Sequence, residues 1–175
     1  MRTYVIQRSK VLKKVICEVR NGDHTDYPLV HIGTHGEGFE YGYHGSSPAD
    51  LAWSILANVL GESNMTDQEQ RTGDFLSAKL HQRFKEQFIA PLNPEMPRHI
   101  LFEEGILAWL EQMGLDVNEY TTRRELYRNN KRAMDRLEEE YASRELTTSV
   151  QSYWSELNRM TIEYQEWLHA LTVRE

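Results

Sequence analysis

The residues of this chain that are best suited to chemistry lie between Tyr41 and Asp50, where a glycine-rich segment leads into an apolar run. A helix that begins in this segment presents free backbone N–H groups and the positive end of its dipole, which together bind phosphates or carboxylates. The hydroxyl groups of Ser46 and Ser47 could add donors to such a site. The pattern therefore indicates a candidate ligand-binding site formed by Tyr41, Tyr43, His44, Ser46, Ser47 and Asp50.

The same segment also has a purely structural interpretation. Ser47 suits the N-cap position of a helix, Pro48 suits its first helical position, and Asp50 follows Ser47 by three residues as in a capping box. The Asp50 carboxylate would bind the N–H groups that an anion needs and would repel the anion. We therefore favour a capped corner between a sheet and a helix. The segment has neither the lysine of a P-loop nor the G-x-G-x-x-G spacing, so neither nucleotide-binding motif applies.

Three histidines near this segment, His31, His35 and His44, could bind zinc or supply a general base for Ser46. His31 and His35 belong to a predicted loop, where spacing in the sequence does not determine distance, and no cysteine joins them. Gly45-Ser46-Ser47 also differs from the G-x-S-x-G motif of serine hydrolases. We expect no catalytic residue, no metal site and no cofactor, and the convergence of the three histidines stays open.

Composition restricts the class of protein. A chain of 175 residues is long enough for one domain with an appendage, and its formal net charge of -7 disfavours a general nucleic-acid binder. The single cysteine, Cys17, excludes an intrachain disulfide and suits a reducing compartment. No apolar signal segment occurs at the N-terminus, and no apolar run is long enough to span a membrane. We expect a cytoplasmic protein that binds neither membranes nor nucleic acid.

The first part of the sequence predicts an α+β fold, in which a small N-terminal antiparallel sheet packs on three helices. Runs rich in Val, Ile and Tyr predict two strands of a hairpin and a short third strand, at 3–7, 11–19 and 28–30. Periodic apolar residues predict helices over 48–60, 74–90 and about 102–113. The segment from 62 to 73 is expected to be a loop, and the proline-rich segment from 91 to 97 an irregular connection.

After Gly114 the sequence predicts a helical hairpin, so we divide the chain into a core domain, 1–113, and an extension, 114–175. The first helix of the hairpin is expected to begin with a capping box at Thr122 and Glu125. Apolar residues of the second helix alternate spacings of three and four, which is typical of a helix that packs along a partner. This stripe could also bind another protein, or a second copy through 116–175, and its candidate interface residues are Tyr153, Trp154, Leu157, Met160, Tyr164 and Trp167.

The segment from Gly38 to Ala52 reads Gly-Phe-Glu-Tyr-Gly-Tyr-His-Gly-Ser-Ser-Pro-Ala-Asp-Leu-Ala. Together with the later helical segment 80–90, it resembles a small uncharacterised family, a domain of unknown function found in bacteria, plasmids and phages. The resemblance covers about residues 1–113 and implies no activity. This chain has Tyr41 where the family usually has Trp, and it has His44 and Ser47 where the family usually has Gly.

Three functional hypotheses follow from these patterns. The first is a non-enzymatic interaction protein of a phage or mobile element, which binds a host protein or itself and could inhibit or regulate a host defence protein. It is motivated by the lack of a convergent catalytic set and by the many Tyr and Trp residues, which anchor interfaces. The second is a small enzyme or ligand-binding protein with an anion site at the first helix. The third is a scaffold that self-associates through the tail.

Overall fold

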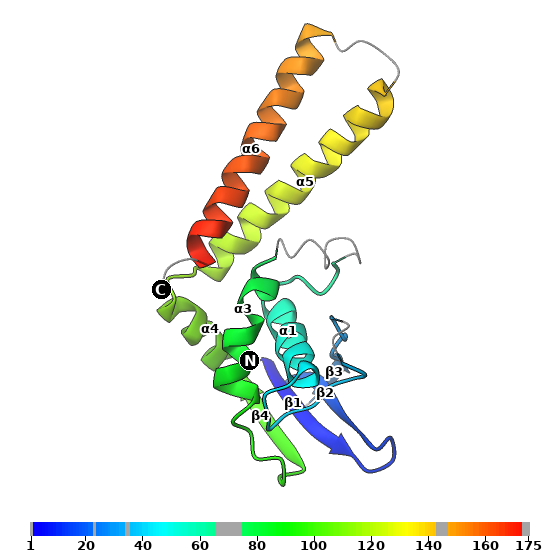
Figure 1. The fold of residues 1–175 in the computed structure, drawn as a ribbon, viewed down its shortest axis with the longest axis vertical. Helices are drawn as coiled ribbons and strands as arrows, with labels where there is room; N and C mark the ends of the chain where they lie inside the picture. The colour runs from blue at the N-terminus through cyan, green and yellow to red at the C-terminus, as the bar shows by residue number, and fades with distance from the viewer. Residues whose placement is uncertain (1, 23, 34–35, 66–74, 143–146, 173–175) are drawn as a thin grey trace. The chain divides into compact units, whose positions relative to one another are not determined.

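The computed structural model describes residues 2–22, 24–33, 36–65, 75–142 and 147–172 (Figure 1). The chain divides into two compact units, Met1–Met113 and Gly114–Glu175, and each unit is described by itself. No helix among the described residues is both long enough and apolar enough to cross a membrane.

The first unit contains a four-stranded antiparallel sheet with the strand order β3-β2-β1-β4. The strands are β1 (Arg2–Ser9), β2 (Lys14–Asn21), β3 (His24–Pro28) and β4 (Arg98–Phe102). The predicted hairpin is confirmed, but the third strand begins four residues before the predicted one. The fourth strand was not predicted at all. Phe102, which we had assigned to a helix, is the last residue of this strand.

One face of the sheet carries the core of the first unit. Tyr4 and Ile6 of β1 are fully buried, and they pair with Val19 and Cys17 of β2, which are also buried. The Tyr4 hydroxyl donates to Asn58 Oδ1 at 2.8 Å, which places the first helix on this face. Side chains of a strand alternate between the two faces of the sheet. The residues that lie between these buried positions therefore point away from the helices.

The helices of the first unit are α1 (Ser46–Val59), α3 (Leu76–Phe84), the π-helix η1 (Lys85–Ile89) that continues it, and α4 (Glu103–Gln112). In α1 every side chain from Pro48 to Ala57 is buried, so this helix is the centre of the unit. Ile32, Trp53 and Phe75 form part of a cluster that joins α1 to the residues before α3. The predicted α+β architecture, with a sheet packed on helices, is confirmed.

The second unit is the predicted hairpin of two helices, α5 (Val117–Tyr141) and α6 (Thr148–Thr172). The predicted start of α5 at Thr122 is wrong, because the helix begins five residues earlier. Its N-cap is Asp116, whose side chain accepts hydrogen bonds from the backbone N–H groups of Asn118 and Glu119 at 2.8 and 3.0 Å. Stacked rings join the two helices, with Tyr127 on Tyr164 at 4.5 Å between ring centroids.

Candidate functional site

The start of α1 differs from the predicted capping box. Gly45, not Ser47, is the N-cap, and no side chain accepts a hydrogen bond at this position. A Cβ atom on Gly45 would lie 2.3 Å from Cε2 of Tyr43, so a larger residue there would require the exposed Tyr43 ring to move. Pro48 consequently lies inside the first turn, where its missing N–H still removes no helical hydrogen bond.

The carboxylate of Asp50 is buried inside the unit and does not cap the helix. Its Oδ2 accepts a hydrogen bond from the backbone N–H of Gly36 at 2.9 Å, and His31 Nε2 lies 3.4 Å from the same oxygen. Gly33 approaches so closely that an added Cβ atom would lie 2.6 Å from Asp50 Oδ1. Asp50 therefore holds the segment before the helix against α1.

Asp50 belongs to a row of polar side chains along α1, which we call the polar stripe and which comprises Ser47, Asp50, Ser54 and Asn58. Spacings of three and four residues place all four on one side of the helix. Ser54 Oγ accepts from the N–H of Ile32 at 2.8 Å, and Asn58 Nδ2 donates to the Tyr27 hydroxyl at 3.1 Å. The polar stripe therefore binds neighbouring chain segments, which is a structural use of these side chains.

The six residues that are predicted to bind a ligand lie in different environments. Tyr41 is buried, its hydroxyl donates to the Met96 carbonyl at 2.7 Å, and its ring lies beside the Arg8 guanidinium. Tyr43, His44 and Ser46 are exposed, whereas Asp50 is buried and Ser47 is half-buried. These differences in burial and in partners leave a ligand-binding role for the group as a prediction.

His44 is the first member of a series of polar contacts between side chains of η1 and of the end of α3. Its Nδ1 lies 2.5 Å from Glu86 Oε2, and Glu86 Oε1 lies 3.1 Å from Lys85 Nζ. Lys85 Nζ donates to Gln82 Oε1 at 2.7 Å, and Gln82 Nε2 contacts His81 Nε2 at 2.9 Å. The hydrogen bond from Lys85, followed by the charge of His44, lowers the pKa of Glu86.

Two of the three histidines proposed as metal ligands lie beside different carboxylates. His31 contacts Asp50, and His44 contacts Glu86. His35 lies outside the described residues. Within the described part of the chain, no group of three or more His, Cys, Asp or Glu residues is placed to hold a metal ion.

Cys17 offers no nucleophile. The side chain is buried in the sheet, and burial raises the pKa of its thiol well above the usual range. Because the thiolate is the reactive form, a buried thiol of this kind behaves as a small apolar side chain.

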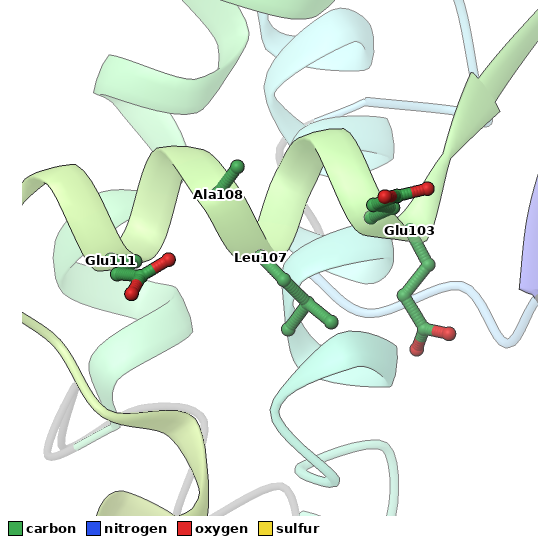
Figure 2. A pocket seen from close by; sticks show the side chains of 5 residues that line it. Glu103, Leu107, Ala108 and Glu111 are labelled. Carbon is green, nitrogen blue, oxygen red and sulfur yellow. The ribbon is translucent and has the colours of Figure 1, made fainter.

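Helix α4 carries an acidic exposed side with a shallow depression along it. Figure 2 shows Glu103, Leu107, Ala108 and Glu111 on this helix, and Glu104 also lines the depression. Glu103 is paired with Arg2 across a distance of 2.9 Å. Carboxylates on an exposed helix are ordinarily solvated, so we assign no chemistry to this surface.

The candidate interface residues of α6 are mostly used inside the hairpin. Leu157 and Tyr164 are buried, whereas Trp154, Met160 and Trp167 are half-buried. Tyr153 is the most exposed of the six, with 53% of its surface accessible. The stripe thus packs along α5, and a role in binding another protein stays a prediction.

Sequence reasoning missed the surface at β4, which is an edge strand by the strand order. Its Ile100 and Phe102 point away from the helices and are 44% and 52% exposed. The alternating residues Arg98-His99-Ile100-Leu101-Phe102 are a strand pattern that could have been found. The three prolines that precede this segment predict an irregular connection instead.

The model of DUF6166, a family of unknown function, matches residues 4–112. Comparisons with curated proteins and with solved structures give no match. The matched region includes the whole sheet except the first two residues of β1, together with the polar stripe of α1 and all of α4. Because the match spans more than half of the chain, this protein belongs to the DUF6166 family of unknown function.

Proposed function

We propose that this protein is a non-enzymatic protein-binding domain and that it binds its partner through the outer edge of β4. The observation that carries this proposal is the combination of a strand edge that pairs with no other described strand and two exposed apolar side chains, Ile100 and Phe102. Edge strands of this kind bind extended segments of other proteins by strand addition, in which backbone hydrogen bonds give affinity and alternate side chains give specificity.

The register of the sheet determines which backbone groups are available. The N–H of Arg8 donates to the Pro97 carbonyl at 3.0 Å, so Pro97 directs its carbonyl towards β1. Because this direction alternates along an antiparallel strand, His99 and Leu101 also bond to β1. Arg98 and Ile100 therefore direct both their N–H and C=O groups outwards, away from the sheet.

Apolar side chains at this edge lie on the outer face of the sheet, which is the face without helices. Ile100 pairs with Val5 of β1, which is 1% exposed although it lies on the face without helices. Met96, just before the strand, is 50% exposed. An extended partner that pairs with β4 would cover Ile100 and Phe102 and continue this surface.

The proposal keeps the chain in the cytoplasm and outside the membrane, in agreement with its composition and its single, buried cysteine. The phage or plasmid setting that the family resemblance implies would favour a host protein as partner.

The test is a selection of random peptides of about 12 residues displayed on phage, because strand addition needs only a short extended segment. The full-length protein is immobilised at a density at which neighbouring chains do not meet. We expect peptides with alternating apolar residues that bind the wild type and lose binding to Ile100→Pro. This substitution removes the outward N–H and the exposed isoleucine side chain but no hydrogen bond to β1, and it is of a type that edge strands tolerate.

Ile100→Lys is the second variant, in case proline disturbs the strand. Ile162→Lys is the matched control, because Ile162 on α6 is 45% exposed and Ile100 is 44% exposed. Peptides that bind wild type and both Ile100 variants equally, or no enriched peptide at all, would overturn the proposal.

A further inference from the structure

We infer that β4 pairs with β4 of a second copy of this chain, antiparallel about a two-fold axis at Ile100, so that two sheets become one. The inference rests on the proposed function, because it uses the same strand edge, and it names the partner. Most soluble homo-oligomers have two-fold symmetry, and such an interface requires a surface that is complementary to itself.

The backbone of β4 meets this requirement. Ile100 is the middle residue of the five-residue strand, and its N–H and C=O both point outwards. Placed on a two-fold axis, Ile100 exchanges two hydrogen bonds with Ile100 of the second copy, as directly opposed residues do in an antiparallel pair. The N–H of Phe102 then donates to the Arg98 carbonyl of the second copy, and the reverse bond follows by symmetry.

The ends of the strand limit the pairing to these residues. Phe102 is the N-cap of α4, so its carbonyl already accepts the first hydrogen bond of that helix. At the other end, the N–H of Met96 already donates to the Asn93 carbonyl at 3.2 Å, and the Met96 carbonyl accepts from the Tyr41 hydroxyl at 2.7 Å. The paired segment is therefore short, and the interface is small.

The side chains are complementary in the same register. Arg98, Ile100 and Phe102 all lie on the outer face, so Arg98 of each copy is opposite Phe102 of the other. A guanidinium beside an aromatic ring is a favourable cross-strand pair. Ile100 packs against Ile100 of the second copy at the axis.

The charges near the strand do not oppose this register. The paired residues, Arg98 to Phe102, include no carboxylate, so no two negative charges face each other in this register. The alternative of a shift by two residues would move Ile100 opposite Phe102 or Arg98 and leave one end of each short strand unpaired. The centred register therefore uses the most backbone groups.

Sedimentation velocity of the full-length protein tests the inference. Because the interface is small, the concentration range runs from about 1 to about 200 µM, where weak specific dimers form. We expect the mass to rise from one chain of 20.6 kDa towards twice that value. Ile100→Pro and Ile100→Lys should remain monomeric over the whole range, whereas Ile162→Lys should dimerise like wild type.

Amide hydrogen exchange gives a readout that needs no variant. In the dimer the N–H groups of Ile100 and Phe102 become protected as concentration rises, whereas those of His99 and Leu101, which already bond to β1, change little. A dimer that Ile162→Lys abolishes, or that both Ile100 variants keep, would assign self-association to another surface and overturn the inference.

The two proposals fail in different ways. A wild-type protein that stays monomeric at every concentration overturns pairing between copies, but the binding function stands if displayed peptides still require Ile100. Absence of both peptide binding and dimerisation overturns the two together.

Discussion

In the α+β unit, polar side chains of a buried helix hold the preceding chain segment, whereas in the helical hairpin stacked aromatic rings join the two helices. Asp50 and Ser54 each bind backbone groups of the segment from Ile32 to Gly36. In the hairpin, Arg159 is paired with Glu156 and Glu163 on the solvent side of α6. Buried hydrogen bonds specify one loop conformation, but stacked rings specify only which helix faces lie together.

This contrast indicates which substitutions should lower the stability of each unit most. Loss of a buried polar partner leaves an unsatisfied group in the α+β unit, and such a group destabilises more than the loss of an exposed ion pair. The hairpin has a narrow apolar interface, so it depends on a few rings. Tryptophan fluorescence reports on the unfolding of both units, because Trp53 and Trp109 lie in the first unit and Trp154 and Trp167 lie in the second.

The largest effect is expected in the hairpin. Tyr164→Ala removes a ring that is 6% exposed and stacked on Tyr127. We expect the free energy of unfolding of the hairpin to fall by about 4 kcal/mol, as for other buried aromatic truncations. Amide hydrogen exchange measures this by segment, and Tyr153→Ala, at an exposed ring, is the control. Equal loss of protection in α1 would mean that the two units unfold as one.

The next effect compares two aspartates that both accept backbone N–H groups. Asp50→Ala removes a fully buried carboxylate and leaves the N–H of Gly36 without this acceptor, and it should cost about 3 kcal/mol. Asp116→Ala removes an exposed N-cap and should cost about 1 kcal/mol. Urea unfolding followed by tryptophan fluorescence measures both values. Similar costs for the two variants would contradict the distinction between a buried clamp and a surface cap.

A smaller effect is expected at Gly42, where the backbone itself makes the contact. Gly42 has a φ of 83°, and a Cβ atom there would lie 2.8 Å from the Leu92 carbonyl oxygen. We expect Gly42→Ala to cost about 2 kcal/mol, from backbone strain and this contact together. Gly22→Ala is the control, since Gly22 also has positive φ but has open space around it. Both variants place alanine at a positive φ. The difference between their melting temperatures therefore measures the destabilisation that comes from the contact with Leu92.

The smallest effects are expected at the exposed carboxylates of the two units. Hydrogen bonds from Lys85 and Arg159 lower the pKa values of Glu86 and Glu156, respectively, below the usual 4.5. A lowered pKa in the folded protein means that each ion pair stabilises it above about pH 4.5 and loses this contribution as the pH falls through the folded pKa. Glu86→Gln and Glu156→Gln should therefore lower the melting temperature slightly at pH 7 and not at pH 3. Addition of salt should reduce both differences.

Local patterns predicted most of the fold. The hairpin of β1 and β2, the buried helix after Pro48 and the antiparallel pair α5 and α6 each depend on neighbouring residues, so their sequences were sufficient. The turn after β2 was also predictable, because Asn21-Gly22 favours positive φ and Gly22 has a φ of 64°.

Contacts between distant residues could not be predicted in the same way. Asp50 had the spacing of a capping residue, but its acceptor role depends on Gly36, which reaches it only through the path of the loop. Gly45 is the N-cap in place of Ser47, and the ring of Tyr43 lies close to it, a contact that no sequence rule describes. Strand β4 pairs with β1 from the far end of the unit, so its short pattern was outweighed by the prolines beside it.

The pairing of Thr3 with Phe102 also bears on the order in which this unit folds. The first three strands are neighbours in the chain and can join early, whereas the fourth must wait until the helical segment between them has collapsed and brought the ends together. We therefore expect the β4 edge, through which we propose that the protein binds, to be the last part of the sheet to assemble. A nascent chain would then lack this binding edge until synthesis of the unit is nearly complete, which would limit premature association on the ribosome.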